Sequence, residues 1–160
     1  MKYGQSRGGT TISWIDGEWH DEEPAVAKAT DHAMWLGSAV FDGARSIAGK
    51  VPDLEAHCAR AIRSSEIMGM APDITTEEMV ELCHEGIQKF PDDAQLYICP
   101  LFYPSGGFVV PDPDSTHFVL TVEEAPLPEP TGFKACLSPF RRPAPEMAPT
   151  EAKAACLYPN

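Results

Sequence analysis

Several absences in the sequence exclude whole classes of protein. No apolar run is long enough to cross a bilayer, and the first residues, MKYGQSRGG, lack the apolar region of a secretory signal. Basic side chains are scarce, with 12 against 24 acidic ones, and a net charge of −12 repels phosphate backbones and anionic lipids. We therefore expect neither nucleic acid nor a membrane among the partners of this chain.

The cysteines and histidines lack the spacing of a metal site or a redox dithiol. The five cysteines are scattered, odd in number and without a C-x-x-C pair, and the five histidines show no H-x₃₋₅-H spacing. The cysteines are Cys58, Cys83, Cys99, Cys136 and Cys156. This usage predicts reduced thiols, no metal ion and a cytoplasmic location.

The length and composition predict one folded domain followed by the start of another. A chain of 160 residues with 43% apolar and 22% charged residues is globular in composition and long enough for one core. The proline-rich stretch 126–132 has the composition of an interdomain linker. We expect a small domain over 1–125, this linker, and over 133–160 the beginning of a larger domain, without internal repeats.

The first half of the chain predicts a hairpin, a strand and a helix. Two β-prone runs in 11–23 flank Asp16-Gly17, a pair that favours a tight hairpin turn. A strand and turn are expected within 33–50. A helix is expected from Asp53, a possible cap, to about Met68-Gly69, because small and apolar residues recur at helical spacing.

The second half predicts one more helix and three strands. Thr75-x-x-Glu78 is a capping-box pattern, and the helix that it opens should run toward Phe90, with Pro91 as its stop. The β-prone segments are 94–103, 115–125 and 132–140. A hairpin, two consecutive helices and returning strands together predict an α+β sandwich with the helices on one face of the sheet.

Single residues leave the chemistry open. Lys153 lies among small residues, where a lysine removed from water can act as an amine nucleophile, although most lysines near a terminus are solvated. Arg60 and Arg63 suit phosphate recognition or a solvated helix face. Tyr97 is either a functional hydroxyl or a core aromatic, and Arg141-Arg142 fits a surface turn.

Motifs in order along almost the whole chain resemble one enzyme family. The motifs are WIDGEW, HAMWLGSAVFDGARS, LEAHCARAIRSSEIMGM, LYICPLFY and LSPFRRPAPEMAPTEAKAACLYPN. They resemble the N-terminal half of the fold-type IV (class IV) pyridoxal-phosphate aminotransferases, closest to branched-chain amino-acid aminotransferases. The resemblance implies their small α/β-sandwich domain, a homodimer, and transamination of branched-chain or similar aliphatic amino acids with 2-oxoglutarate.

The resemblance also implies a role for particular residues. Lys153 matches the lysine that holds pyridoxal 5'-phosphate as a Schiff base and then moves a proton, and Arg60, in HCAR, matches the arginine that binds the cofactor phosphate. Tyr158 matches the tyrosine that meets the cofactor's phenolic oxygen. The residues matching the substrate side are Phe41, Tyr97 and Cys99, and Arg45 matches an arginine that supports the site from behind.

The chain departs from the family pattern in ways that bear on the substrate. Cys99 stands where branched-chain enzymes carry an arginine for the side-chain carboxylate of glutamate, and a neutral thiol cannot form that bidentate ion pair. The stretch 34–37 has lost the tyrosine of LHYG, and Asp42 replaces a glutamate. The family's second domain continues beyond the equivalent of Asn160, so we expect these 160 residues to be inactive alone.

Three functions remain open at this point. The first is the branched-chain aminotransferase. The second is another enzyme of the same fold, a D-amino-acid aminotransferase or an aminodeoxychorismate lyase. The third is a non-catalytic binding domain that has kept the fold, against which the joint presence of Lys153, Arg60 and Tyr158 counts.

Overall fold

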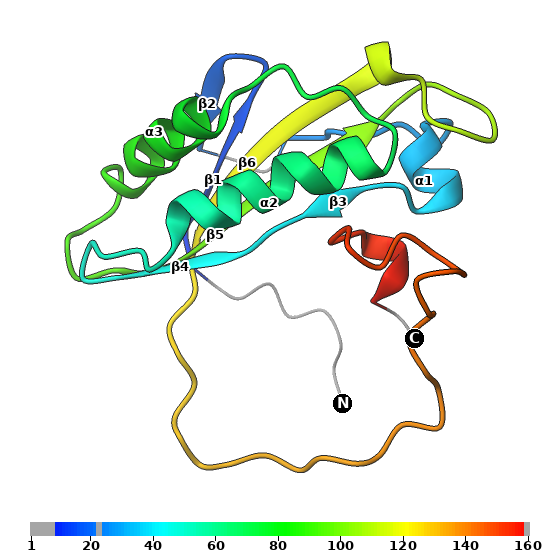
Figure 1. The fold of residues 1–160 in the computed structure, drawn as a ribbon. Helices are drawn as coiled ribbons and strands as arrows, with labels where there is room; N and C mark the ends of the chain where they lie inside the picture. Colours follow the sequence, from blue (N-terminus) through cyan, green and yellow to red (C-terminus); the bar gives the residue numbers. More distant parts are fainter. Residues whose placement is uncertain (1–8, 22–23, 159–160) are drawn as a thin grey trace.

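The fold is one antiparallel sheet with two long helices on one of its faces (Figure 1). A computed structural model describes residues 9–21 and 24–158. Residues 1–8 of the expected domain and residues 159–160 therefore lie outside the described residues. The α+β class expected from the sequence is confirmed.

Six strands form the sheet in the order β2-β1-β6-β5-β3, with β4 also paired to β5. The strands are β1 (Thr11–Ile15), β2 (Glu18–His20), β3 (Val40–Phe41), β4 (Ala44–Ile47), β5 (Gln95–Pro104) and β6 (Thr116–Glu124). The predicted hairpin joins β1 to β2, and both Asp16 and Gly17 have the positive φ that its turn requires. The central pair β5 and β6 is the longest, with nine residue pairs in register.

Two helices lie at the positions predicted from the sequence, but not all of their ends fall at the predicted residues. The helices of the structure are α1 (His32–Leu36), α2 (Leu54–Ile67) and α3 (Thr76–Ile87), with short 3₁₀ turns at Pro113–Ser115 and Ala155–Leu157. The capping box of α3 is confirmed, because Thr75 accepts from the Glu78 N–H and the Glu78 carboxylate accepts from the Thr75 N–H. Asp53 precedes α2 as expected, but its φ is +53° and its side chain makes no capping bond. The sequence pattern missed α1.

The core lies between the sheet and the helices α2 and α3. Ile98 and Phe102 of β5 and Val122 of β6 are fully buried, and they share this cluster with Cys58 of α2 and Met79 of α3. Burying side chains of this size stabilises the fold by about 1.5–3 kcal/mol each. No helix in the described part of the chain is long and apolar enough to cross a membrane.

After β6 the chain leaves the core and returns to it. Residues 126–141 are exposed, and the strand predicted over 132–140 is wrong, since the structure has no strand there. Its alternating apolar residues have no neighbouring strand among the described residues to complete a ladder. The chain then comes back to β3, where Ala152, Ala154 and Leu157 join the core.

Candidate active site

Lys153 is held by its own main chain along the free edge of β3. Its carbonyl accepts from the Phe41 N–H at 3.2 Å, and its amide donates to the Ser64 hydroxyl of α2 at 3.0 Å. Ala154 pairs with Val40 in an isolated antiparallel bridge, and the Ala155 N–H donates to the Ala39 carbonyl at 2.8 Å. Small side chains at 152, 154 and 155 permit this close approach, so the lysine is fixed to the domain although a long loop precedes it.

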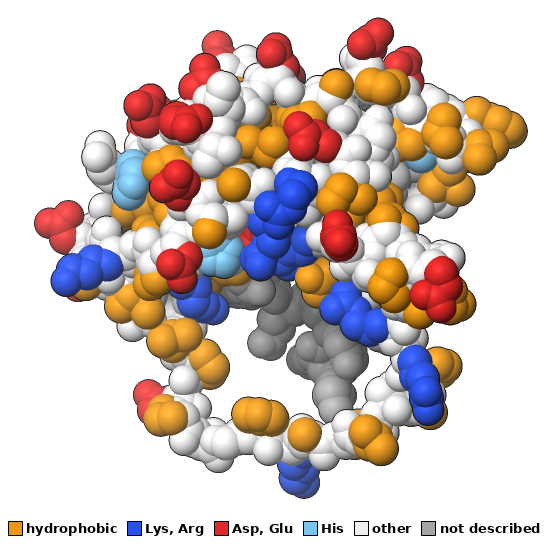
Figure 2. Space-filling model, in the orientation of Figure 1, with side chains coloured by type: hydrophobic (Ala, Val, Ile, Leu, Met, Phe, Trp, Pro, Cys, Tyr) orange, Lys and Arg blue, Asp and Glu red, His pale blue; other side chains and the backbone are white. Residues whose placement is uncertain are grey.

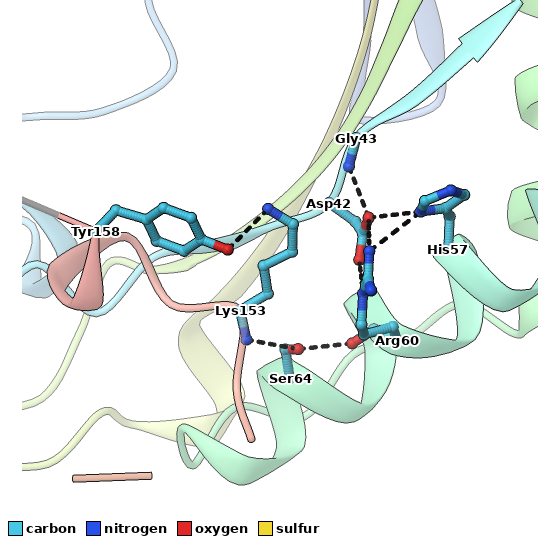
Figure 3. A network of polar contacts seen from close by, with 7 residues as sticks. All are labelled: Asp42, Gly43, His57, Arg60, Ser64, Lys153 and Tyr158. Carbon is cyan, nitrogen blue, oxygen red and sulfur yellow. Dashed lines mark hydrogen bonds and ion pairs between the residues drawn. The ribbon is translucent and has the colours of Figure 1, made fainter. Parts of the chain in front are cut away.

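The Lys153 amine lies among aromatic side chains. Its Nζ donates to the Tyr158 hydroxyl at 3.1 Å (Figure 3). It lies 3.9 Å from the centroid of the Phe41 ring and 4.7 Å from that of the Tyr158 ring. The Phe41 and Tyr158 rings pack at 5.3 Å with a tilt of 53°. Ammonium and ring faces attract each other, so these contacts orient the lysine toward the tyrosine oxygen.

Arg60 approaches the same place from α2 and is gripped by a buried carboxylate. Asp42, fully buried, accepts from Arg60 Nε at 2.5 Å and from Nη2 at 2.8 Å, and it also accepts from the Gly43 N–H at 2.7 Å. The Nδ1 atom of His57 lies 2.8 Å from the same carboxylate. Burial alone would raise the pKa of Asp42, but the hydrogen bonds from Arg60, His57 and Gly43 lower it below its ordinary value. The same contact raises the pKa of Arg60.

The basic and aromatic residues surround an open hollow of about 180 Å³. Its lining residues are Arg60, Arg142, Thr150, Glu151, Ala152, Lys153 and Tyr158. Arg142 donates to the Leu157 carbonyl at 3.4 Å and places its guanidinium 5.1 Å from the Tyr158 ring centroid. Figure 2 shows Lys and Arg side chains gathered at the centre of this face, so the site is locally basic on an acidic protein. Such a hollow suits a planar anion.

A larger hollow of about 410 Å³ lies elsewhere, lined by residues that include Lys28, Asp31, Tyr103 and His117. Volume alone would favour it. However, none of the sequence-predicted site residues lines it, and it lacks the nucleophile beside a hydroxyl that the smaller hollow has. We therefore take the smaller hollow as the candidate site.

The predicted substrate residues all lie on the face of the sheet that α2 and α3 leave uncovered. Side chains opposite each other in an antiparallel ladder share a face, and Phe41 pairs with Leu101 while Arg45 pairs with Tyr97. Cys99 follows Tyr97 by two residues and so shares this face. The intervening Ile98 and its partner Ala44 point into the core beneath the helices. The amine of Lys153 lies on the same side, over Phe41.

The polar residues on this face differ in their surroundings; they are Arg45, Tyr97 and Cys99. Arg45 donates to the Ala125 carbonyl at 2.6 Å, and its guanidinium lies 6.0 Å from the Tyr97 ring centroid. Burial raises the pKa of the Cys99 thiol to about 11, although a hydrogen bond with Tyr97 and the charge of Lys153 act in the opposite direction. Cys99 is therefore a neutral thiol at pH 7.

Some residues of the site were missed from the sequence and others lie apart from it. Asp42 and His57 enter the site as partners of Arg60, and Ser64 fixes the Lys153 amide. The signal that could have found His57 is its position three residues before Arg60, one helical turn away. Arg63 is exposed on α2, and it is not among the residues that line the hollow.

Comparisons with known proteins show to which family the chain belongs. Residues 39–160 match the model of the family described as "Amino-transferase class IV". The chain is similar to an aminotransferase of Brucella abortus, solved bound to the co-factor PLP, with a TM-score of 0.89 and 40% identity over 94% of this chain and 55% of that one. It is 30% identical to a probable branched-chain-amino-acid aminotransferase of Rickettsia bellii, over 91% of this chain and 51% of that protein.

A shorter match is to a D-alanine aminotransferase of Staphylococcus epidermidis, at 32% identity over 45% of this chain and 26% of that protein. The chain thus spans about half the length of the Rickettsia relative. The family model, in contrast, covers most of the chain, from just before β3 to its last residue. The chain belongs to the class IV aminotransferase family.

Proposed function

We propose that the protein containing these residues is a pyridoxal-phosphate aminotransferase that acts on branched-chain or similar aliphatic amino acids, with 2-oxoglutarate as the amino acceptor. The observation that carries the proposal is the meeting of a lysine amine and a tyrosine hydroxyl, 3.1 Å apart, in a hollow that Arg60 also lines. An amine can bond covalently to an aldehyde, a hydroxyl can donate to a phenol oxygen, and a guanidinium can bind a phosphate.

The residues of the hollow fit pyridoxal phosphate. Lys153 would hold it as a Schiff base, Tyr158 would donate to its phenolic oxygen, and Arg60 would bind its phosphate. When bound, this cofactor supplies a ring that withdraws electrons from the substrate Cα. The Lys153 amine, once released, would hold the proton taken from that Cα, and the Phe41 and Tyr158 rings would keep the amine in place.

The uncovered face of the sheet supports an apolar substrate side chain. Phe41 and Leu101 lie on this face as a ladder pair, and Cys99 adds a neutral thiol beside them. Tyr97 would contact the substrate carboxylate, and Arg45 would hold the Tyr97 ring from behind. The acceptor 2-oxoglutarate rests on the resemblance of the sequence motifs to branched-chain aminotransferases, whereas Cys99 offers no positive charge to its side-chain carboxylate.

The D-alanine aminotransferase match favours a second candidate, a D-amino-acid aminotransferase. Both candidates need Lys153 and the same cofactor, so they differ only in the amino acid that they take. Initial rates with leucine, isoleucine and valine against D-alanine, each with 2-oxoglutarate, separate them. Higher kcat/KM for D-alanine would favour the second candidate.

Exposed apolar residues support a homodimer and a second domain as further parts of the proposal. Met34, Trp35 and Leu36 of α1 and Phe108, Val109 and Val110 of the β5–β6 loop are 49–82% exposed. A second copy of the chain would cover this surface, and a light-scattering mass of twice that of one chain would show the dimer. Phe133 and Leu137, 94% and 98% exposed, would belong to the larger domain that begins at residue 133, so 126–132 would be the linker.

We further propose a cytoplasmic location, because the scattered thiols stay free.

The chemistry at Lys153 is tested by trapping the bond. Full-length protein is mixed with pyridoxal phosphate, reduced with borohydride, digested and mapped by mass spectrometry. We expect the pyridoxyl adduct on the peptide that contains Lys153, its loss in Lys153→Ala, and its retention in Lys134→Ala, which removes an exposed lysine of the loop. An unmodified Lys153 would refute the proposal.

A further inference from the structure

Asp42 has no role in the proposed function so far, yet both oxygens of its carboxylate are bonded. Its side chain is completely buried, and its two oxygens accept from Arg60 Nε, Arg60 Nη2 and the Gly43 amide, with His57 Nδ1 2.8 Å from Oδ1 (Figure 3). His57 Nδ1 is also 3.2 Å from Arg60 Nη2. A carboxylate with so many partners is fixed in position, and it fixes whatever it binds.

Arg60 is bound along one edge and open along the other. Its side chain is 42% exposed although the Asp42 side chain behind it is completely buried, and Arg60 lines the hollow that Lys153 and Tyr158 also line. A guanidinium carries five N–H bonds in a planar fork. Asp42 occupies Nε and part of Nη2, while Nη1 has no hydrogen-bond partner among residues 9–21 and 24–158. The unoccupied edge is therefore available to an anion in the hollow.

Two effects of Asp42 on anion binding oppose each other. Its negative charge offsets the charge of Arg60 and weakens the attraction for an anion. Its bidentate grip removes the rotational freedom of a long side chain, so that an anion need not order it. The two hydrogen bonds from Asp42 act directly on the Arg60 guanidinium. The negative charge of Asp42 acts on the anion only from the far side of the guanidinium, and it is also shared with His57. We expect the grip to outweigh the charge.

We propose that Asp42 is a positioning residue for the cofactor phosphate, holding the Arg60 guanidinium in its binding orientation while His57 holds the carboxylate. The inference rests on the proposed function, because it concerns the phosphate of the same cofactor. It gives the buried Asp42 and the partly exposed His57 a role in the site, although neither lines the hollow. Asp42 thus acts through Arg60 and not by touching the cofactor.

The experiment compares two ligands that differ only in the phosphate. Dissociation constants of pyridoxal phosphate and of pyridoxal are measured by absorbance with full-length protein, unmodified and as Asp42→Asn. We expect Asp42→Asn to weaken pyridoxal phosphate about tenfold, the size of one charge-assisted hydrogen bond, and pyridoxal less than about twofold. In an Arg60→Gln background, Asp42→Asn should change neither constant further.

The controls separate positioning from charge and from folding. Glu55→Gln removes the same charge from an exposed position on α2, and we expect it to alter neither constant. If Asp42→Asn does not fold, His57→Gln carries the test, because the His57 side chain is 27% exposed, and we expect about a threefold loss for pyridoxal phosphate alone. Equal losses for both ligands would overturn the inference, since they would show a structural role only.

Two further outcomes also decide the matter. Unchanged or tighter pyridoxal phosphate binding by Asp42→Asn would overturn the inference, because the charge of Asp42 would then outweigh its grip, while the Lys153 adduct would still support the proposed function. Failure of the unmodified protein to bind pyridoxal phosphate at all would overturn both.

Discussion

The position of Tyr97 depends on the absence of a side chain at residue 43, which Gly43→Ala tests. A Cβ built on Gly43 would lie 2.7 Å from Tyr97 Cζ and 2.8 Å from Cε2, closer than the 3.4 Å at which ordinary contact begins. The Tyr97 hydroxyl lies closer still to that Cβ, so the side chain must move by more than about 0.7 Å from the place where Arg45 packs on the ring. Gly43 does not have a positive φ, so alanine adds no backbone strain and the effect is one of contact.

The expected magnitude follows from two opposing contributions. Overpacking of this kind costs about 1–3 kcal/mol, and replacing glycine by alanine restricts the unfolded chain and returns about 0.4–1 kcal/mol. We expect a net loss of about 1–2 kcal/mol in the free energy of unfolding, measured by urea denaturation with circular dichroism, and a higher KM for the amino donor. In a Tyr97→Ala background the same change should cost nothing. Equal urea midpoints for the unmodified protein and Gly43→Ala would refute the reasoning.

Three further predictions concern other groups. The folded pKa of Asp42 lies below its ordinary value of 3.8, so the ionised Asp42 stabilises the folded state above that pH, and this stabilisation is lost as the pH falls through the folded pKa. Acid denaturation should therefore show a smaller pH dependence in Asp42→Asn than in the unmodified protein. With a pKa of about 11, Cys99 should react with iodoacetamide at pH 8 more slowly than the exposed Cys136 and Cys156, as peptide mass spectrometry would show, and equal rates would contradict its burial. Thr75→Ala should lower the free energy of unfolding by about 1 kcal/mol, measured with urea, because it removes the cap of α3, and an unchanged midpoint would speak against the capping box.

The elements that the sequence predicted well are those whose cause is local. Asp16-Gly17 makes its own turn, and Thr75 and Glu78 bond to each other's backbone within one turn of helix. The segment 132–140 has the alternation of a strand, but a strand exists only with a partner, and a partner is not a local property. The short helix α1 has neither a side-chain capping bond nor an acidic first turn, and its local signals, Asp31 before it and the left-handed Gly37 after it, enclose only five residues, too few for a helical repeat.

The candidate site, like the fold, could be predicted from the sequence only in part. Family motifs identified Lys153, Arg60 and Tyr158, and the hollow that they line brings together residues up to 98 positions apart in the chain, from Arg60 to Tyr158. Motifs gave no indication that Asp42 lies behind Arg60, because this contact joins the end of β3 to α2 across 18 positions. Only the packing of the helix on the sheet creates it.

Because residues 152–155 are attached to the edge of β3, the position of Lys153 does not depend on the loop that precedes these residues. The nucleophile is located by hydrogen bonds to Phe41, Ala39 and Ser64, all of which precede Lys153 by more than 80 residues. Residues 126–141 could therefore be lengthened, shortened or cut by a protease without displacing the lysine. A protein nicked there would hold its C-terminal piece as a non-covalent complex, with the geometry of the site intact.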